Sequence, residues 1–369
     1  MTRILWLAPS FNHYKARFLN RLAEEKDVEL TILAGTGRQG QGDLDLDENW
    51  NFNYQKLMVS KAKFGGSKEV RAYIRKHLSA FDWILIPAEK KNLLLFMFSM
   101  RLRKRRKSNV KLFSYNHPLL KSKRGRFKAI DRELTKFFYK HLDAVVFYTE
   151  ASYHLAIEEN LVDPKKAYWA NNTIDTKEID TFYSFVLPPK DKLILLFIGR
   201  LIPSKRVDYF LEYTAQLETK LKQEIFIEII GDGPERHHVE TALKQRKNVT
   251  WHGAVVDEQI ISPIMSRSSL IFMPGLSGLS INHALAYGRP YATLEAERHG
   301  PEISYLRHNH NGFILPENVD QANAILVPFL SSQEQIKKFC EQAKKDNETV
   351  SIDLWIKKMK SNLLIQASS

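Results

Sequence analysis

Cysteine is almost absent from this chain, and long apolar runs are absent altogether. The single cysteine among 369 residues is Cys340, so no disulfide can form within the chain, and we expect a reducing compartment. No stretch reaches the roughly 18 apolar residues that span a bilayer. The longest candidate, residues 92–100 (NLLLFMFSM), is about half that length, and the first residues lack the pattern of a secretory signal. We therefore expect a cytoplasmic protein of two ordinary-sized domains.

Residue sets that hold metal ions are also scarce. No Cys/His cluster has the spacing of a zinc site. Asp43, Asp45 and Asp47 alternate in a way that suits a divalent cation on a nucleotide sugar, but they lie in a polar loop and not at the end of an apolar strand. We therefore expect no metal and no other cofactor.

Acidic residues are nearly missing from one stretch. From Lys90 to Lys140 the chain has 17 lysines and arginines against Asp131 and Glu133, a net charge of +15, whereas the remaining 318 residues sum to −2. This excess is larger than the solvated faces of two helices require, and it favours an anionic partner. We favour an anionic membrane surface. Nucleic acid is the competitor, but the nearby aromatic residues are spaced as a helix core and not as a base-stacking platform.

Short apolar runs alternate with helical patterns along almost the whole chain. Nearly continuous apolar runs are typical of strands buried on both faces of a parallel sheet, so the alternation predicts a doubly wound α/β architecture. The predicted strands are residues 3–8, 28–34, 83–87, 110–115, 144–148, 167–171, 193–198, 225–230, 249–253, 270–274, 291–294 and 312–315. The clearest helical patterns are residues 14–25, 207–221, 235–246 and 279–287.

One segment breaks the alternation near the middle of the chain. Residues 181–191 (TFYSFVLPPKD) hold a Pro-Pro pair and no clear period, which indicates an interdomain linker. We therefore expect two Rossmann-like domains, one at residues 1–185 and one at residues 186–350. Residues 351–369 are expected to add an amphipathic helix.

Two cations follow a strand of the second predicted domain. In residues 199–205 (GRLIPSK), Gly199 and Arg200 end the strand, and Lys205 lies just before a helix. Strand ends of this polarity are where open α/β sheets bind ligands. A guanidinium and an ammonium held there suit a diphosphate, although a solvated loop would show the same residues.

Two further turns carry glycine at the ends of predicted strands. Gly231 and Asp232 belong to residues 231–234 (GDGP), which suit a backbone contact to a nucleoside or a simple tight turn. After the strand at 270–274 comes a glycine-rich loop that we expect to approach a phosphate closely. Its predicted binding residues are Gly275, Leu276, Gly278, Leu279 and Ser280.

Single polar residues complete the candidates. His117 follows the strand at 110–115, where it would face the cleft, and we predict a catalytic role for it beside Arg200 and Lys205. A lone histidine near a strand end is more often structural than catalytic, and a structural role is the alternative for His117. Glu302 and His299, in residues 298–302 (RHGPE), are lesser candidates.

Together these motifs resemble the retaining GT-B glycosyltransferases of family four, also called glycosyl transferases group one. The resemblance is strongest from Asn172 to Gly312. It covers residues 172–176 (NTIDT), 199–205, 231–234, 284–290 (ALAYGRP) and 300–303 (GPEI). It implies a GT-B fold in which two Rossmann-like domains face a cleft. Residues 1–185 would bind the acceptor, residues 186–350 would bind the nucleotide sugar, and the helix in residues 351–369 would cross back to the first domain.

The donor loop departs from the family pattern at two positions. The family usually has two glutamates with seven residues between them, and the matching positions here are Gly275 and His283. A variant branch explains this, because the surrounding glycine, proline and alanine positions are intact. In that branch His283 would bond ribose or diphosphate. An inactive binding protein is the alternative.

The resemblance implies transfer of a sugar from a nucleoside-diphosphate sugar, UDP by default, to a saccharide or a polyprenyl- or lipid-linked saccharide. It implies retention at the anomeric carbon, no essential metal, and a role in surface-polysaccharide assembly at the cytoplasmic face of a membrane. The alternatives are a scaffold with this fold that binds membrane or nucleic acid, or a sugar epimerase or phosphorylase. The acceptor would pass Ser10, Asn12, His13 and Arg17.

Overall fold

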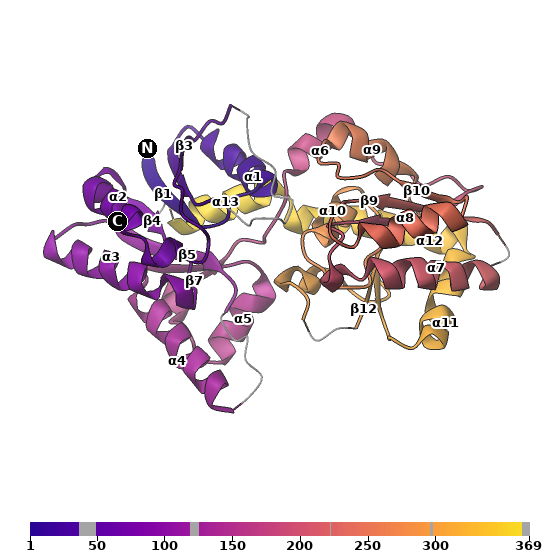
Figure 1. The fold of residues 1–369 in the computed structure, drawn as a ribbon. Coiled ribbons are helices and arrows are strands. Elements are labelled where there is room, and N and C mark those ends of the chain that lie inside the picture. The colour runs from indigo at the N-terminus through magenta and orange to yellow at the C-terminus, as the bar shows by residue number, and fades with distance from the viewer. Residues whose placement is uncertain (37–48, 119–124, 222, 296–297, 364–369) are drawn as a thin grey trace. The chain divides into compact units, whose positions relative to one another are not determined.

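The chain forms two compact units. The computed structural model describes residues 1–36, 49–118, 125–221, 223–295 and 298–363. Contacts group Met1–Asn172 with the C-terminal segment from Ile352 into unit 1, and Thr173–Ser351 into unit 2 (Figure 1). Each unit is built on its own parallel sheet.

Unit 1 carries a seven-stranded sheet in the order β3-β2-β1-β4-β5-β6-β7, and all its pairs within the described residues are parallel. The order reverses between β1 and β4. The strands are β1 (Thr2–Ala8), β2 (Val28–Ala34), β3 (Asn53–Lys56), β4 (Trp83–Leu85), β5 (Lys111–Asn116), β6 (Ala144–Phe147) and β7 (Ala167–Trp169). The helices are α1 (His13–Ala23), α2 (Lys68–His77), α3 (Leu93–Arg105), α4 (Gly125–His141), α5 (Glu150–Glu158) and α13 (Ile352–Leu363).

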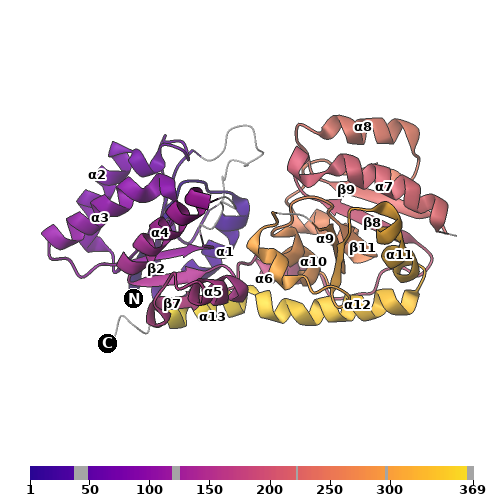
Figure 2. The same ribbon diagram turned by 90° about the horizontal axis from the view of Figure 1, so that it is seen from below.

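Two apolar clusters cover the two faces of this sheet. One joins the sheet to α2, α3, α4 and α5, and the other joins it to α1 and α13 (Figures 1 and 2). Trp355 of α13 packs edge-on against Phe18 of α1, with ring centroids 4.9 Å apart, and its indole N–H donates to the Tyr115 hydroxyl at 2.9 Å. The last helix of the chain is therefore part of the core of unit 1.

Unit 2 carries a six-stranded parallel sheet in the order β10-β9-β8-β11-β12-β13. The order reverses between β8 and β11. The strands are β8 (Leu193–Ile198), β9 (Ile225–Ile230), β10 (Val249–Trp251), β11 (Leu270–Phe272), β12 (Tyr291–Leu294) and β13 (Gly312–Leu315). The helices are α6 (Thr176–Phe182), α7 (Val207–Lys220), α8 (Arg236–Gln245), α9 (Glu258–Arg267), α10 (Ser280–Ala286), α11 (Val319–Leu330) and α12 (Gln333–Asp346), and the 3-10 turns near the site are η5 (Pro203–Lys205) and η6 (Pro301–Tyr305).

The unit boundary lies earlier than the sequence indicates. It falls after Asn172, whereas the Pro-Pro pair places it near residue 185. The reason is packing of the expected linker on unit 2. The Tyr183 hydroxyl donates to the Tyr287 carbonyl at 2.9 Å, and the fully buried Arg289 guanidinium donates to the Val186 carbonyl at 2.7 Å.

The twelve predicted strands and the alternation of strands and helices are confirmed, with ends that differ by a few residues. The edge strand β3 was missed, because all four of its residues are exposed and it has no apolar period. Asp43, Asp45 and Asp47 lie outside the described residues. Within the ranges that the structure describes, no helix has both the length and the apolarity to cross a membrane.

Candidate nucleotide-sugar site

The candidate residues of unit 2 gather where its strand order reverses. Gly199 and Arg200 follow β8, and the loop at residues 274–280 follows β11, its neighbour in the sheet. Open α/β sheets bind ligands in the crevice outside the carboxyl ends of the strands at such a reversal. The topology therefore brings two of the sequence motifs to one binding position.

The GDGP turn after β9 lies directly against the turn after β8. Gly231 has φ +143°, and a Cβ built on it would lie 1.8 Å from the Gly199 carbonyl oxygen. Gly233 has φ +156°, and its Cβ would lie 2.3 Å from the Leu201 carbonyl oxygen. Only glycine satisfies both the conformation and the space. These glycines thus fix the backbone of the β8 turn whether or not they contact a ligand.

The glycine-rich loop is held on one side by η5. A Cβ at Gly275 would lie 2.3 Å from the Ser204 carbonyl oxygen and 2.7 Å from the Lys205 Cα. The Leu276 N–H donates to that same Ser204 carbonyl at 2.7 Å, and the Lys205 ammonium donates to the Leu276 carbonyl. The glutamate that the related family carries at position 275 therefore has no room in this arrangement.

The segment at residues 299–302 holds the loop on its other side. The Gly300 N–H donates to the Ser277 carbonyl at 2.8 Å, and the Ser277 N–H donates to Nδ1 of His299 at 3.1 Å. Nε2 of His299 lies 2.9 Å from the Leu294 carbonyl, which can only accept, so Nε2 carries the proton and the ring is neutral. Burial and the nearby Lys205 lower the pKa of His299, whereas the bond to Leu294 opposes this.

Side-chain hydroxyl groups also join the glycine-rich loop to β12. The Tyr291 hydroxyl donates to Ser277 Oγ at 3.0 Å and lies 2.8 Å from Ser280 Oγ. Ser277 Oγ in turn donates to Thr293 Oγ1 at 3.0 Å. Burial raises the pKa of Tyr291 to about 12, so its hydroxyl stays protonated at neutral pH. The loop is therefore fixed by both backbone and side-chain bonds.

Two cations and one carboxylate meet at this loop. Burial and, to a smaller extent, the charge of Arg200 lower the pKa of Lys205 to about 8, although Glu302 opposes both effects. Glu302 is only 5% exposed, and its carboxylate lies beside Gly278 and Gly300. Two like charges held close together repel until an anion lies between them. The electrostatics of the site therefore suit a bound anion.

His283 is buried one turn into α10, where only 3% of its surface is exposed. Its Nε2 lies 2.8 Å from Glu258 Oε1, and the Tyr287 hydroxyl donates to Glu258 Oε2 at 2.6 Å. Burial, together with Glu258, raises the pKa of Tyr287. The structure places His283 against α9 and Glu258, and its contact to ribose or diphosphate stays a prediction.

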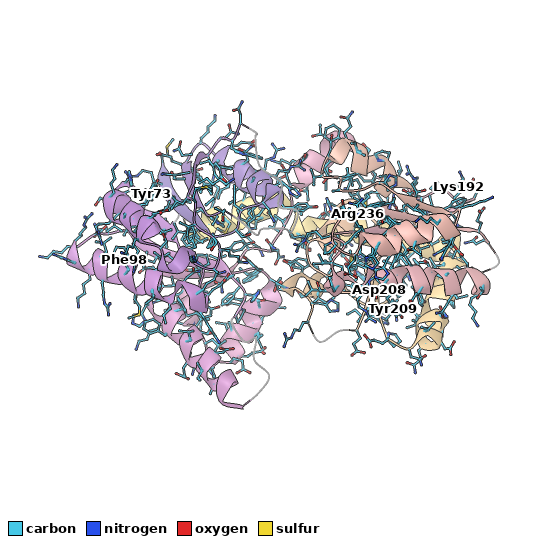
Figure 3. All side chains as sticks on the ribbon, viewed as in Figure 1. Tyr73, Phe98, Lys192, Asp208, Tyr209 and Arg236 are labelled. Atoms are coloured by element: carbon cyan, nitrogen blue, oxygen red, sulfur yellow. The ribbon has the colours of Figure 1, made fainter. Side chains whose placement is uncertain are left out.

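Asp232, another predicted donor-side residue, lies in the turn between β9 and α8. Asp232 Oδ1 accepts from the Gly233 N–H at 2.7 Å. Arg236, labelled in Figure 3, lies 3.6 Å from Asp232 Oδ2 and 5.2 Å over the ring of Trp251. The Trp251 indole N–H donates to the Gly231 carbonyl at 2.8 Å. This turn is thus stabilised from both ends.

One trio among the described residues has the donor atoms for a metal ion. Glu235, His237 and His238 each offer one ligand atom within 4.8 Å of the others. His237 is exposed, and the other two are partly so. The trio belongs to the start of α8, whereas Arg200, Lys205 and the glycine-rich loop belong to the turns after β8 and β11.

His117 of unit 1 follows β5 at the carboxyl edge of its sheet. Its Nδ1 lies 3.0 Å from the Pro118 carbonyl, so Nδ1 carries a proton, and in the neutral form of the ring Nε2 is an acceptor. The ring packs edge-on against Tyr148, with centroids 6.1 Å apart. These contacts fix the ring and leave the predicted catalytic role untested.

The predicted acceptor residues lie in the turn after β1 and at the start of α1. Asn12 caps this helix, because its Oδ1 accepts from the Lys15 N–H at 3.1 Å, and the Lys15 ammonium donates to the Ser10 carbonyl at 3.2 Å. His13 is buried and Arg17 partly buried. β1 borders the reversal of strand order in unit 1, with β4 between it and β5. The sheet thus brings these residues to the same edge as His117.

Sequence reasoning missed several residues that hold the site. Tyr291 and Thr293 were assigned only to a strand, Glu258 was not singled out, and His299 was considered without a stated partner. Their bonds to Ser277 and His283 join segments 14 to 25 residues apart. Alternating polar positions in the apolar strand at 291–294 (YATL) were the available signal.

Residues 180–346 match the model of the family described as Glycosyl transferases group 1. This similarity covers a little less than half of the chain. The matched range spans β8 to β13 and therefore includes every residue placed above at the β8 and β11 turns. A comparison with curated proteins finds no match.

The whole chain is similar in fold to several solved structures. Anabaena Alr3699/HepE in complex with UDP and glucose is 14% identical, with a TM-score of 0.68 over 99% of this chain and 100% of that one. Sucrose-phosphate synthase from Thermosynechococcus elongatus is 13% identical, with a TM-score of 0.70 and full coverage of both chains. The lipopolysaccharide outer core galactosyltransferase WaaB is 14% identical, with a TM-score of 0.68 over 99% of this chain and 100% of that one. The two parallel sheets and these matches show the GT-B fold.

Proposed function

We propose that this protein transfers a sugar from a nucleoside-diphosphate sugar to a hydroxyl of a saccharide or lipid-linked saccharide, with retention at the anomeric carbon. The observation that carries the proposal is the pair of cations, Arg200 and Lys205, beside the glycine-rich loop at the reversal of strand order in unit 2. The match of residues 180–346 to Glycosyl transferases group 1 supports sugar transfer. The resemblance of the sequence motifs to the retaining glycosyltransferases of family four supports retention.

The two cations would bind the diphosphate and stabilise it as it leaves. Negative charge develops on the diphosphate when the bond to the anomeric carbon breaks, and fixed cations aimed at that charge lower the barrier. Arg200 and Lys205 repel each other in the free protein, so a bound diphosphate relieves that repulsion. Backbone N–H groups from Gly278 to Ser280 would contribute to the same anion. With two cations supplying this charge, we propose that no metal ion is essential.

His117 would position the reacting groups from the side of unit 1. Its Nε2 is an acceptor in the neutral ring, so it suits a sugar hydroxyl. Ser10, Asn12, His13 and Arg17 would contact the acceptor. Glu302 would contact the donor from beside Gly278.

The proposed donor nucleotide and the proposed membrane location are drawn from the similar structures and from the charge of unit 1. Structures of Alr3699/HepE hold UDP, and WaaB is a lipopolysaccharide galactosyltransferase, which favours UDP and a surface polysaccharide here. The basic stretch from Lys90 to Lys140 favours association with an anionic membrane at its cytoplasmic face.

Turnover of Arg200→Ala and Lys205→Ala tests the assignment. Each variant should lose about 100- to 1,000-fold in kcat/KM, because each removes one charge that stabilises the leaving group. Lys220→Ala, at the exposed end of α7, is the matched control and should keep the wild-type rate. Wild-type rates in both site variants, with unchanged melting temperatures, would overturn the assignment.

A further inference from the structure

A groove between α2 and α3 combines arginines with an apolar floor. It has a volume of about 350 Å³, and its lining contains no acidic residue. The two helices lie side by side in unit 1 (Figures 1 and 2). The lining residues are Arg71, Arg75, Arg101, Arg105, Leu94, Met97, Phe98 and Leu102.

The groove is built by contacts between its own walls. The Arg106 guanidinium at the end of α3 donates to the Arg75 carbonyl of α2 at 2.6 Å, which joins the two helices. Arg75 lies over the ring of Phe98, 5.4 Å from its centroid, and Arg71 donates to the Gly66 carbonyl at 3.1 Å. Phe98 is labelled in Figure 3 on α3. The arginines therefore stand over an apolar floor and do not pair with carboxylates within the lining.

One exposed apolar residue extends the floor outward. Leu94, at the start of α3, is 61% exposed, and Met97 lies one turn further along the same helix. Two of the four arginines come from α2, outside the basic stretch that the sequence singled out. The fold thus assembles an amphiphilic surface that neither segment carries alone.

We propose that this groove binds the phosphate headgroup of an anionic lipid in a bilayer, with Leu94 and Met97 entering the acyl boundary. Guanidinium groups bind phosphate in a planar, bidentate manner, and an apolar floor matches the glycerol and acyl part of the same molecule. A nucleic acid offers phosphate but no aliphatic partner for Leu94. This inference deepens the membrane part of the proposed function and rests on it.

Cosedimentation with vesicles tests the groove directly. Full-length protein is mixed with vesicles of phosphatidylcholine alone or with about one third phosphatidylglycerol, over a salt series. The groove variant replaces four arginines by glutamine: Arg71→Gln, Arg75→Gln, Arg101→Gln and Arg105→Gln. The control variant removes the same charge from exposed lysines elsewhere: Lys26→Gln, Lys165→Gln, Lys244→Gln and Lys247→Gln.

Wild type should bind the anionic vesicles and not the neutral ones. The groove variant should lose at least about 100-fold in partition coefficient, since each basic residue near the surface contributes about fivefold. The control variant should stay within about threefold of wild type. A double variant, Leu94→Gln with Met97→Gln, should weaken the part of binding that survives high salt.

Three results would overturn the inference: no vesicle binding by wild type, equal losses in the groove and control variants, or equally groove-dependent binding of single-stranded DNA that displaces the vesicles. Melting temperatures of all variants check folding. The assay needs no sugar transfer, so vesicle binding without turnover would count against the proposed reaction alone, and turnover without vesicle binding against the lipid groove alone.

Discussion

The carboxyl edges of the two sheets hold their candidate residues in different ways. In unit 2, the loop at residues 275–280 is bound through backbone groups to η5 on one side and to Gly300 on the other. In unit 1, His117 is oriented by a bond to the next carbonyl and by the ring of Tyr148, and Asn12 serves as a helix cap. The loop of unit 2 is held by backbone groups, whereas the edge of unit 1 depends on individual side chains. This difference suits the proposed roles, a diphosphate site in unit 2 and an acceptor site in unit 1.

The largest effect should come from adding one methyl group to the preorganised edge. Gly275→Ala would force the loop away from Ser204 and Lys205, whose atoms lie 2.3 and 2.7 Å from the new Cβ. We expect a loss on the order of 1,000-fold in kcat/KM, with about 1–3 kcal/mol in the free energy of unfolding. Steady-state kinetics and denaturant titration measure both.

Gly66→Ala is the control, because a Cβ there meets nothing within 4 Å. It should leave kinetics and stability within error of wild type. A Gly275→Ala protein with wild-type donor affinity would show that the loop is not held as described.

Removal of the His117 side chain should test whether the two sheet edges have separate roles in catalysis and in nucleotide binding. His117→Ala should lower kcat by about 100-fold, because the group that orients the reacting hydroxyl is lost. The thermal shift produced by a nucleoside diphosphate should be unchanged, since that ligand would bind unit 2. His154→Ala, on the exposed face of α5, is the matched control. Loss of nucleotide binding in His117→Ala would contradict the division of roles.

The pH dependence of activity should report the ionisation of Lys205. Because the pKa of free Lys205 is lowered to about 8, kcat/KM should be nearly level around pH 7 and fall about tenfold per unit well above pH 8. In the window between about 8 and the ordinary lysine pKa of 10.5, the unfolded chain binds more protons, so the contribution of Lys205 to stability rises with pH while activity falls. Lys205→Arg should remove the alkaline limb. An unchanged limb in that variant would assign it to another group.

The smallest effect should come from removing the Tyr291 hydroxyl, which joins β12 to the glycine-rich loop. Tyr291→Phe removes the bonds to Ser277 and Ser280 and should cost about 1 kcal/mol of stability and a few-fold in donor affinity. Tyr168→Phe removes an exposed bond to the Lys165 carbonyl in unit 1 and should change neither quantity measurably. Equal effects in the two variants would show that the network does not position the loop.

The buried strands could be predicted from the sequence because each is a short apolar run between turns, and the motifs could be placed at their ends. The contacts that hold the loop could not. Lys205 meets Leu276 across 71 residues, and that pairing depends on how two turns pack. In the sequence, Gly275 is a departure from the family pattern. The structure gives the physical reason, because a side chain at this position would collide with Ser204 and Lys205. The exposed strand β3 and the packing of Tyr183 were likewise invisible to periodicity.

Thermal stabilisation by UDP, GDP, ADP and TDP, measured on wild type and Arg200→Ala, tests the central claim most directly. A ligand that binds only the folded protein adds about 2.7 kcal/mol at 100 times its dissociation constant. We predict a clear shift with one nucleotide, UDP by default, and its loss in Arg200→Ala. No shift with any nucleotide, or an equal shift in the variant, would contradict a diphosphate site at the β8 and β11 turns.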